Sequence, residues 1–269
     1  VFDANGIPFV LMKGLALAED LYGSQAYLRT FGDIDILISQ SKLASVLPLL
    51  ESMGYRGTGS TSIDSYLTDP NRAHHIPELT NESPAMKNVI LEVHVDMVLS
   101  WIFQRKKYDT DEILQRSYIN EFGIPVMDDY DAIIFMMIHI LKHYAYDLVA
   151  GFVCGEIKSE FDIKAIHELA LFIDKRKSTL KKGFFRERAC EYGIGNELVY
   201  MCNLLKKIYP SLQSILDIDF QRDKTSGFVN RFSRAAMEME TGEILFGDKQ
   251  KNIENIIAGM QSDAYKLPC

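Results

Sequence analysis

The chain has 269 residues, of which 47% are hydrophobic and 25% charged, and these proportions exclude a disordered or low-complexity protein. Its 29 basic and 37 acidic side chains give a net charge of −8. Proteins bind nucleic-acid backbones by neutralising the phosphates with basic side chains, so this negative net charge disfavours a long nucleic-acid partner. It does not exclude a local basic pocket that binds a small nucleotide.

Nothing in the sequence indicates a secreted or membrane protein. The four cysteines form no CxxC pair, so neither a zinc ribbon nor a disulfide framework is indicated. The longest apolar stretch, residues 132–141, is too short to span a bilayer, and no secretory leader pattern is visible. The chain begins at Val1 and not at a methionine, so we expect that an upstream piece is missing. We expect a soluble, cytoplasmic protein with no membrane partner.

The first half of the sequence alternates between strand and helix patterns. Apolar runs predict strands at residues 7–12, 33–38 and 89–97, and helical spacing predicts helices at residues 15–22 and 41–53. Residues 57–88 are rich in Gly, Ser, Thr, Asp, Asn and Pro, which predicts a long connection with a short strand near residues 74–76. Alternating strands and helices are typical of a domain that packs helices on a sheet.

The second half is predicted to be helical throughout. Asp128 and Asp129 offer an N-terminal cap to the first helix of this half. We therefore predict a boundary near Ile124, between a first domain of residues 1–124 and an all-helical domain of residues 125–269. The periodicity predicts six helices, at residues 132–146, 157–174, 183–191, 196–208, 228–240 and 253–265.

The sharpest chemical feature is the pair Asp33 and Asp35 in the second predicted strand. Side chains alternate across a strand, so both carboxylates point to the same face. Two acids so placed repel each other, and Mg²⁺ is the natural occupant because it takes hard oxygen ligands. The plainer alternative is the start of a strand at the surface, with both acids solvated.

The third predicted strand repeats this alternation, so that Glu92, His94 and Asp96 share one face. A carboxylate from this strand beside the first pair would give three acids, which is the composition that holds two divalent ions about 3.5–4 Å apart for nucleotidyl transfer. The alternative is an ordinary solvent-facing strand. The residues alone leave open whether Glu92 or Asp96 would be the third ligand.

Basic residues stand close to these acids in the sequence. Lys13 and Gly14 lie between the first strand and the first helix, where a glycine lets a phosphate approach the backbone and a lysine adds positive charge. Arg29 precedes Asp33 by four residues and could reach the same phosphates. Taken singly, these residues are more simply interpreted as a glycine turn with an exposed lysine and as a surface arginine.

A histidine pair marks the helical half. His139 and His143 are four residues apart and share a helix face. This spacing can bind zinc, but the segment lacks the glutamate of the HExxH motif. A structural histidine pair is the simpler interpretation.

Five segments together resemble a known family. They are LMKGLALAEDLY (residues 11–22), LRTFGDIDILI (28–38), MGY (53–55), LEVHVDM (91–97) and PVMDDYDAIIFMMIHILKH (125–143). They resemble the nucleotidyltransferase superfamily with the DNA-polymerase-β-like fold, and more closely a bacterial family described as uncharacterised nucleotidyltransferases. The resemblance implies the α+β class, with a minimal nucleotidyltransferase fold around a small mixed sheet followed by an all-helical domain.

The resemblance also implies a metal-dependent transfer of a nucleoside monophosphate from ATP or another NTP to an unknown small-molecule or protein acceptor. Asp33 and Asp35 match the metal-binding pair, and Glu92 matches the third acidic position. All three are therefore expected to be catalytic and to bind Mg²⁺ or Mn²⁺. The residues expected to bind nucleotide are Lys13, Gly14, Arg29, His139 and His143.

Two other functions remain open. Lys13 and Gly14 stand where the superfamily has Gly-Ser or Gly-Gly, so a catalytically inactive descendant that binds nucleotide or a protein is one alternative. A sugar-nucleotide glycosyltransferase, whose Asp-x-Asp motif also binds a metal and a diphosphate, is the other. It would need a larger nucleotide-binding sheet before the acidic motif than 32 residues allow.

Overall fold

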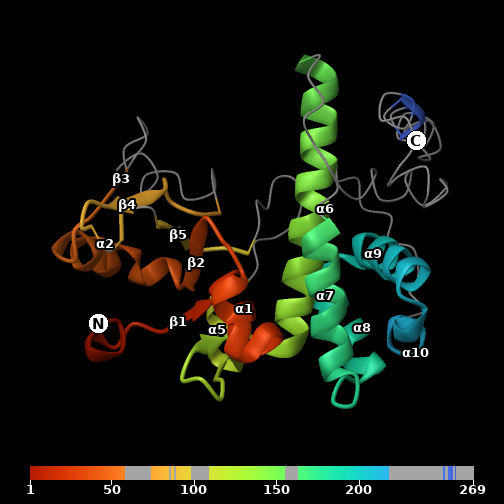
Figure 1. Ribbon diagram of the computed structural model, residues 1–269, viewed down its shortest axis with the longest axis horizontal. Coiled ribbons are helices and arrows are strands. Elements are labelled where there is room, and N and C mark those ends of the chain that lie inside the picture. The colour runs from red at the N-terminus through yellow and green to blue at the C-terminus, as the bar shows by residue number, and fades with distance from the viewer. Residues whose placement is uncertain are drawn as a thin grey trace. The chain divides into compact units, whose positions relative to one another are not determined.

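The computed structural model describes residues 1–57, 74–84, 86–87, 89–97, 109–154, 163–217 and a few residues between 251 and 258. The described residues divide into two compact units, one that ends at Ala132 and one that begins at Ile133 (Figure 1). A seven-stranded mixed sheet and its helices confirm the predicted α+β class. Among the described residues, none of the helices combines the length and the apolar character needed to cross a bilayer.

The sheet of the first unit is built around three strands that the sequence predicts. β2 pairs antiparallel with β1 and parallel with β5. In place of the predicted strand near residues 74–76, the structure has a single bridge between His75 and His94. The short outer strands are not predicted by the sequence pattern. The strand order is β3-β4-β5-β2-β1-β7-β6, with β1 at Phe9–Leu11, β2 at Asp33–Ile38, β3 at Tyr55–Gly57, β4 at Leu79–Asn81, β5 at Ile90–His94, β6 at Tyr118–Ile119 and β7 at Pro125–Val126.

In the part of the first unit that the structure describes, three segments are α-helices. α1 at Leu15–Tyr22 has the predicted bounds. α2 at Leu43–Ser52 follows a 3-10 turn at Gln40–Lys42, so the predicted helix divides into two pieces. α5 at Thr110–Arg116 is an additional helix, capped by the Asp109 side chain, which accepts hydrogen bonds from two backbone N–H groups.

One face of the sheet is closed by α2, and this closure orients the acidic residues. Apolar side chains of α2 and of the two central parallel strands form one buried cluster. Because strand side chains alternate, burial of Ile36 on this face directs Asp33 and Asp35 to the other face. The cluster includes Leu43, Val46, Leu47 and Leu50 of α2 with Ile36, Ile38, Leu91 and Val93 of the strands.

The second unit is helical in its described residues. α6 begins at Asp129 because the Asp128 carboxylate accepts the backbone N–H of Asp131 at 2.8 Å, which confirms the predicted cap. Of the six predicted helices, the one at residues 228–240 lies outside the described residues, as does most of the one at 253–265. The domain boundary near Ile124 stays a prediction. The helices are α6 at Asp129–Cys154, α7 at Ile163–Arg176, α8 at Lys182–Tyr192, α9 at Gly195–Ile208 and α10 at Gln213–Leu216.

Candidate active site

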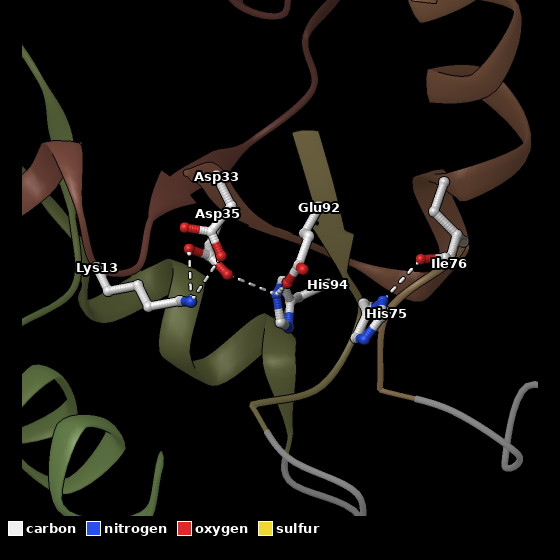
Figure 2. Close-up of polar contacts among 7 residues, drawn as sticks. All are labelled: Lys13, Asp33, Asp35, His75, Ile76, Glu92 and His94. Atoms are coloured by element: carbon white, nitrogen blue, oxygen red, sulfur yellow. Dashed lines mark hydrogen bonds and ion pairs between the residues drawn. The ribbon is translucent and has the colours of Figure 1, made fainter. Parts of the chain in front are cut away.

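The parallel pairing of β2 and β5 gathers the acidic residues. Asp35 stands opposite Glu92 in the register, and Leu37 stands opposite His94. Since alternate residues share a face, Asp33 and Asp35 project from β2 on the same side as Glu92 and His94 from β5, and Figure 2 shows the four side chains together. The two predicted polar faces therefore form one site.

Asp35 lies at the centre of this site. Its side chain is fully buried, and each of its oxygens faces a nitrogen. The Nε2 of His94 donates to Oδ1 at 3.1 Å, and the Nζ of Lys13 lies 3.2 Å from Oδ2. A buried carboxylate is costly unless opposite charges and hydrogen bonds compensate it, and these two contacts supply that compensation.

Lys13 bridges the two aspartates. It follows β1, and its Nζ donates to Asp33 Oδ2 at 3.0 Å as well as lying beside Asp35. Burial alone would lower the pKa of Lys13, but the negative charges of Asp35 and Asp33 outweigh it and raise that pKa. The Lys13 ammonium, which we expect to bind phosphate, thus already forms ion pairs with both carboxylates. Its binding of phosphate stays a prediction.

Glu92 and His94 form the other half of the site. His94 Nε2 lies 3.3 Å from Glu92 Oε2 as well as contacting Asp35. The hydrogen bond from His94 outweighs burial and lowers the pKa of Glu92 to about 2. Burial would lower the pKa of His94, but its bonds to Asp35 and Glu92 raise it. The sequence pattern places His94 on this face but indicates no role for it. Its contacts show that it links the carboxylates of Asp35 and Glu92.

The Lys13-Gly14 turn holds the lysine in place. Gly14 adopts φ 56° and ψ −103°, a conformation that is accessible essentially to glycine. A Cβ at Gly14 would lie 3.5 Å from the Asp33 carbonyl oxygen and 3.9 Å from Arg29 Nη1. The Met12 N–H donates to the Asp35 carbonyl at 3.1 Å. The glycine turn and Arg29 therefore lie beside the acidic strand, and their binding of phosphate stays a prediction.

Two further histidines border the site. The ring centroids of His74 and His75 lie 5.3 and 5.2 Å from that of His94. The Nδ1 of His75 is 2.7 Å from the Ile76 carbonyl, which fixes its ring (Figure 2). The charge of His75 also contributes to the low pKa of Glu92. Their position in a long polar connection leaves open whether they belong to the active site, and these ring contacts place both beside His94.

His139 and His143 belong to the second unit. Their ring centroids are 4.5 Å apart on α6, and His139 also packs against Phe135 at 5.5 Å. These contacts describe an edge-to-face pair of rings within one helix. A role in nucleotide binding stays a prediction for both residues.

The donor set can be compared with the ions expected for such a site. In the described part of the chain, one group of side chains offers three ligand atoms within 4.8 Å of one another, and it consists of Asp35, Glu92 and His94. Asp96, the alternative third acid, is not in this group. Carboxylate oxygens suit Mg²⁺ or Mn²⁺, whereas an imidazole nitrogen is a ligand for transition metals and is poorly suited to Mg²⁺. The group thus fits one divalent ion.

The comparison with known proteins agrees with this geometry. The family model described as an uncharacterised nucleotidyltransferase matches residues 1–210, which include the acidic strands, the Lys13-Gly14 turn and α6. No curated protein and no solved structure matches the chain significantly. Since the matched region covers most of the sequence, the chain belongs to the uncharacterised nucleotidyltransferase family.

Proposed function

We propose that this protein is a metal-dependent nucleotidyltransferase, which moves a nucleoside monophosphate from an NTP to a hydroxyl group of a small molecule or a protein. The observation that carries the proposal is the convergence of Asp33, Asp35 and Glu92 on one face of two paired strands. Three carboxylates in this arrangement need cations, and a nucleoside triphosphate arrives with divalent ions on its phosphates.

The basic residues beside the acids are assigned to the triphosphate. Lys13 and Arg29 supply positive charge, and the glycine turn opens the backbone at the start of α1, where helix N–H groups favour an anion. We assign His139 and His143 to the nucleotide as well, as the resemblance implies. The divalent ion, when bound, would offset the charge that develops on the phosphates during transfer.

Glu92 is assigned to the cation rather than to proton transfer. A general base works best when its pKa is near the working pH, whereas the pKa of Glu92 is about 2. Such a carboxylate stays ionised at neutral pH and is a weak proton acceptor. Asp35 and Glu92 therefore hold the ion, and Asp33 shares the ammonium of Lys13 with Asp35.

The ammonium of Lys13 also supports a second candidate function. Because it already compensates Asp33 and Asp35, a descendant of the family that has lost catalysis could keep a stable acidic face without metal. Such a protein would bind a nucleotide or a partner and transfer nothing. No contact in the described residues specifically favours the glycosyltransferase alternative.

The deciding experiment incubates the purified protein with each of the four α-labelled NTPs, Mg²⁺ or Mn²⁺ and cell extract, and then searches for a labelled acceptor. We expect label to appear with the unaltered chain and to vanish with Asp35→Asn. Asp3→Asn removes an exposed carboxylate from the same unit and should leave labelling unchanged.

Two outcomes distinguish the candidates. Nucleotide binding without transfer for all four NTPs supports the non-catalytic descendant. If the chain neither binds nor transfers any of the four NTPs, the nucleotidyltransferase is excluded, and of the second candidate only a descendant that binds a partner protein remains. Equal labelling by the Asp35→Asn variant and the unaltered chain would mean that the transfer does not use this site.

A further inference from the structure

The two sides of the Asp35 carboxylate meet different cationic groups. On one side, Oδ2 faces the Lys13 ammonium at 3.2 Å. On the other, Oδ1 faces the His94 imidazole at 3.1 Å. The side chain is fully buried, so solvent does not compete for either oxygen. The site is therefore divided into an ammonium side and an imidazole side (Figure 2).

The ammonium side lacks space for a metal ion between the aspartates. The Nζ of Lys13 lies 3.0 Å from Asp33 Oδ2 and 3.2 Å from Asp35 Oδ2, so it stands where an ion shared by both carboxylates would bind. A divalent ion sits about 2.0–2.2 Å from each oxygen ligand and would have to displace the ammonium.

The imidazole side has the geometry of a ligand set. His94 Nε2 lies 3.1 Å from Asp35 Oδ1 and 3.3 Å from Glu92 Oε2. To coordinate an ion, Nε2 releases to solvent the proton that it donates to these carboxylates, and the ion takes the place of that proton. Neighbouring ligands about 2.1 Å from an octahedral ion are separated by about 3 Å. These two distances are close to that spacing, and the side chains of Asp35, Glu92 and His94 each offer a ligand atom within 4.8 Å of the others. The side chains of Asp35 and His94 are almost entirely buried.

We propose that this site takes one divalent ion instead of two, held by Asp35, Glu92 and His94, with Lys13 as a built-in cation in the place of the second. Because the set contains an imidazole nitrogen, it selects Mn²⁺ over Mg²⁺, which strongly prefers oxygen ligands. The inference rests on the proposed function for the use of the ion, but binding of the ion can be measured without any transfer.

The test counts bound Mn²⁺ in the purified chain without nucleotide, from the loss of the electron paramagnetic resonance signal of free Mn²⁺. We expect one ion per chain, with Mg²⁺ competing at least tenfold more weakly. His94→Gln should weaken Mn²⁺ binding at least tenfold and Mg²⁺ binding less than threefold. His167→Gln, at an exposed histidine of the second unit, should change neither.

Variants of Lys13 test the built-in cation. Lys13→Met should raise the number of bound ions towards two, whereas the exposed Lys87→Met should leave it at one. Circular dichroism checks that each variant is folded. If Lys13→Met does not fold, Lys13→Arg keeps the positive charge and should still bind a single ion.

The outcomes separate this inference from the proposed function. Two ions on the unaltered chain, none at all, or unchanged Mn²⁺ affinity in His94→Gln would overturn the inference. One bound Mn²⁺ without any nucleotide transfer would leave the inference standing and count against the proposed function alone. Nucleotide transfer by a chain that binds two ions would overturn the inference and support the proposed function.

Discussion

Asp35 and Glu92 are direct partners in the parallel register of β2 and β5, and both accept a hydrogen bond from the same nitrogen of His94. One imidazole thus links two acidic side chains that would otherwise repel each other. Because Lys13 contacts Asp35 from the other side, the stability of this face depends on charge as well as on apolar packing.

Glu92 should make the stability of the protein depend on acidic pH. Its pKa is lowered from 4.5 to about 2, so its ionised form stabilises the folded state above about pH 4.5, and this contribution is lost as the pH falls towards 2. At pH 6, we expect the free energy of unfolding of the unaltered chain to exceed that of Glu92→Gln by on the order of 2 kcal/mol, after allowance for partial solvent screening. Near pH 2, the two free energies of unfolding should become equal.

Urea unfolding of both chains across this pH range measures the difference. The control is Glu82→Gln, which alters an exposed carboxylate of the same unit and should follow the unaltered chain throughout. A difference between Glu92→Gln and the unaltered chain that stays constant with pH would contradict the assigned pKa.

Gly14 should tolerate no side chain without loss of stability. Its φ of 56° lies in the region that favours glycine, while a Cβ there would make only ordinary contacts at 3.5 Å and beyond. The cost of Gly14→Ala is therefore one of backbone conformation, about 1–3 kcal/mol. Gly32→Ala is the matched control, because Gly32 has no left-handed φ and an added Cβ meets no atom within 4 Å. Equal losses in both variants would refute this explanation.

Asp131 should be far more sensitive to the loss of its charge than an acid of an exposed ion pair. Its fully buried carboxylate accepts two hydrogen bonds from Arg116, one from Nε at 3.0 Å and one from Nη2 at 3.4 Å. Asp131→Asn leaves the guanidinium with the exposed Glu112 carboxylate, whose Oε2 lies 3.6 Å from Nη1, and we expect a loss of about 3–5 kcal/mol. Asp174→Asn breaks the exposed pair with Lys177 and should cost less than about 1 kcal/mol. Thermal unfolding of the two variants compares them, and similar losses would contradict the role of burial.

Two cysteines should differ sharply in their reaction with a thiol reagent. Cys202 is buried, and burial raises its pKa to about 12, whereas Cys190 is exposed. Since the thiolate is the reactive form, Cys190→Ser should remove one rapidly labelled thiol from the folded protein, and Cys202→Ser should remove none. Labelling in denaturant should detect both losses. Rapid labelling of Cys202 in the folded chain would show that it is not protected.

Several elements of the fold could be predicted from local sequence pattern. The bounds of α1 follow from helical spacing, and those of β2 follow from a run rich in β-branched and aliphatic residues. The outer strands β3, β4, β6 and β7 contain only two or three residues each, which is too few for a periodic signal. They exist because neighbouring strands offer hydrogen-bonding edges, and a short sequence window does not contain that information.

The sequence by itself determined which side chains share a face, because alternation along a strand is a local property that places Asp33 with Asp35 and Glu92 with His94. Only the tertiary structure decided that these faces meet. The contact between Asp35 and His94 joins residues 59 positions apart, and the contact between Lys13 and Asp33 joins residues 20 positions apart. Such contacts depend on strand order and register, which are set by the packing of the whole sheet and its apolar core.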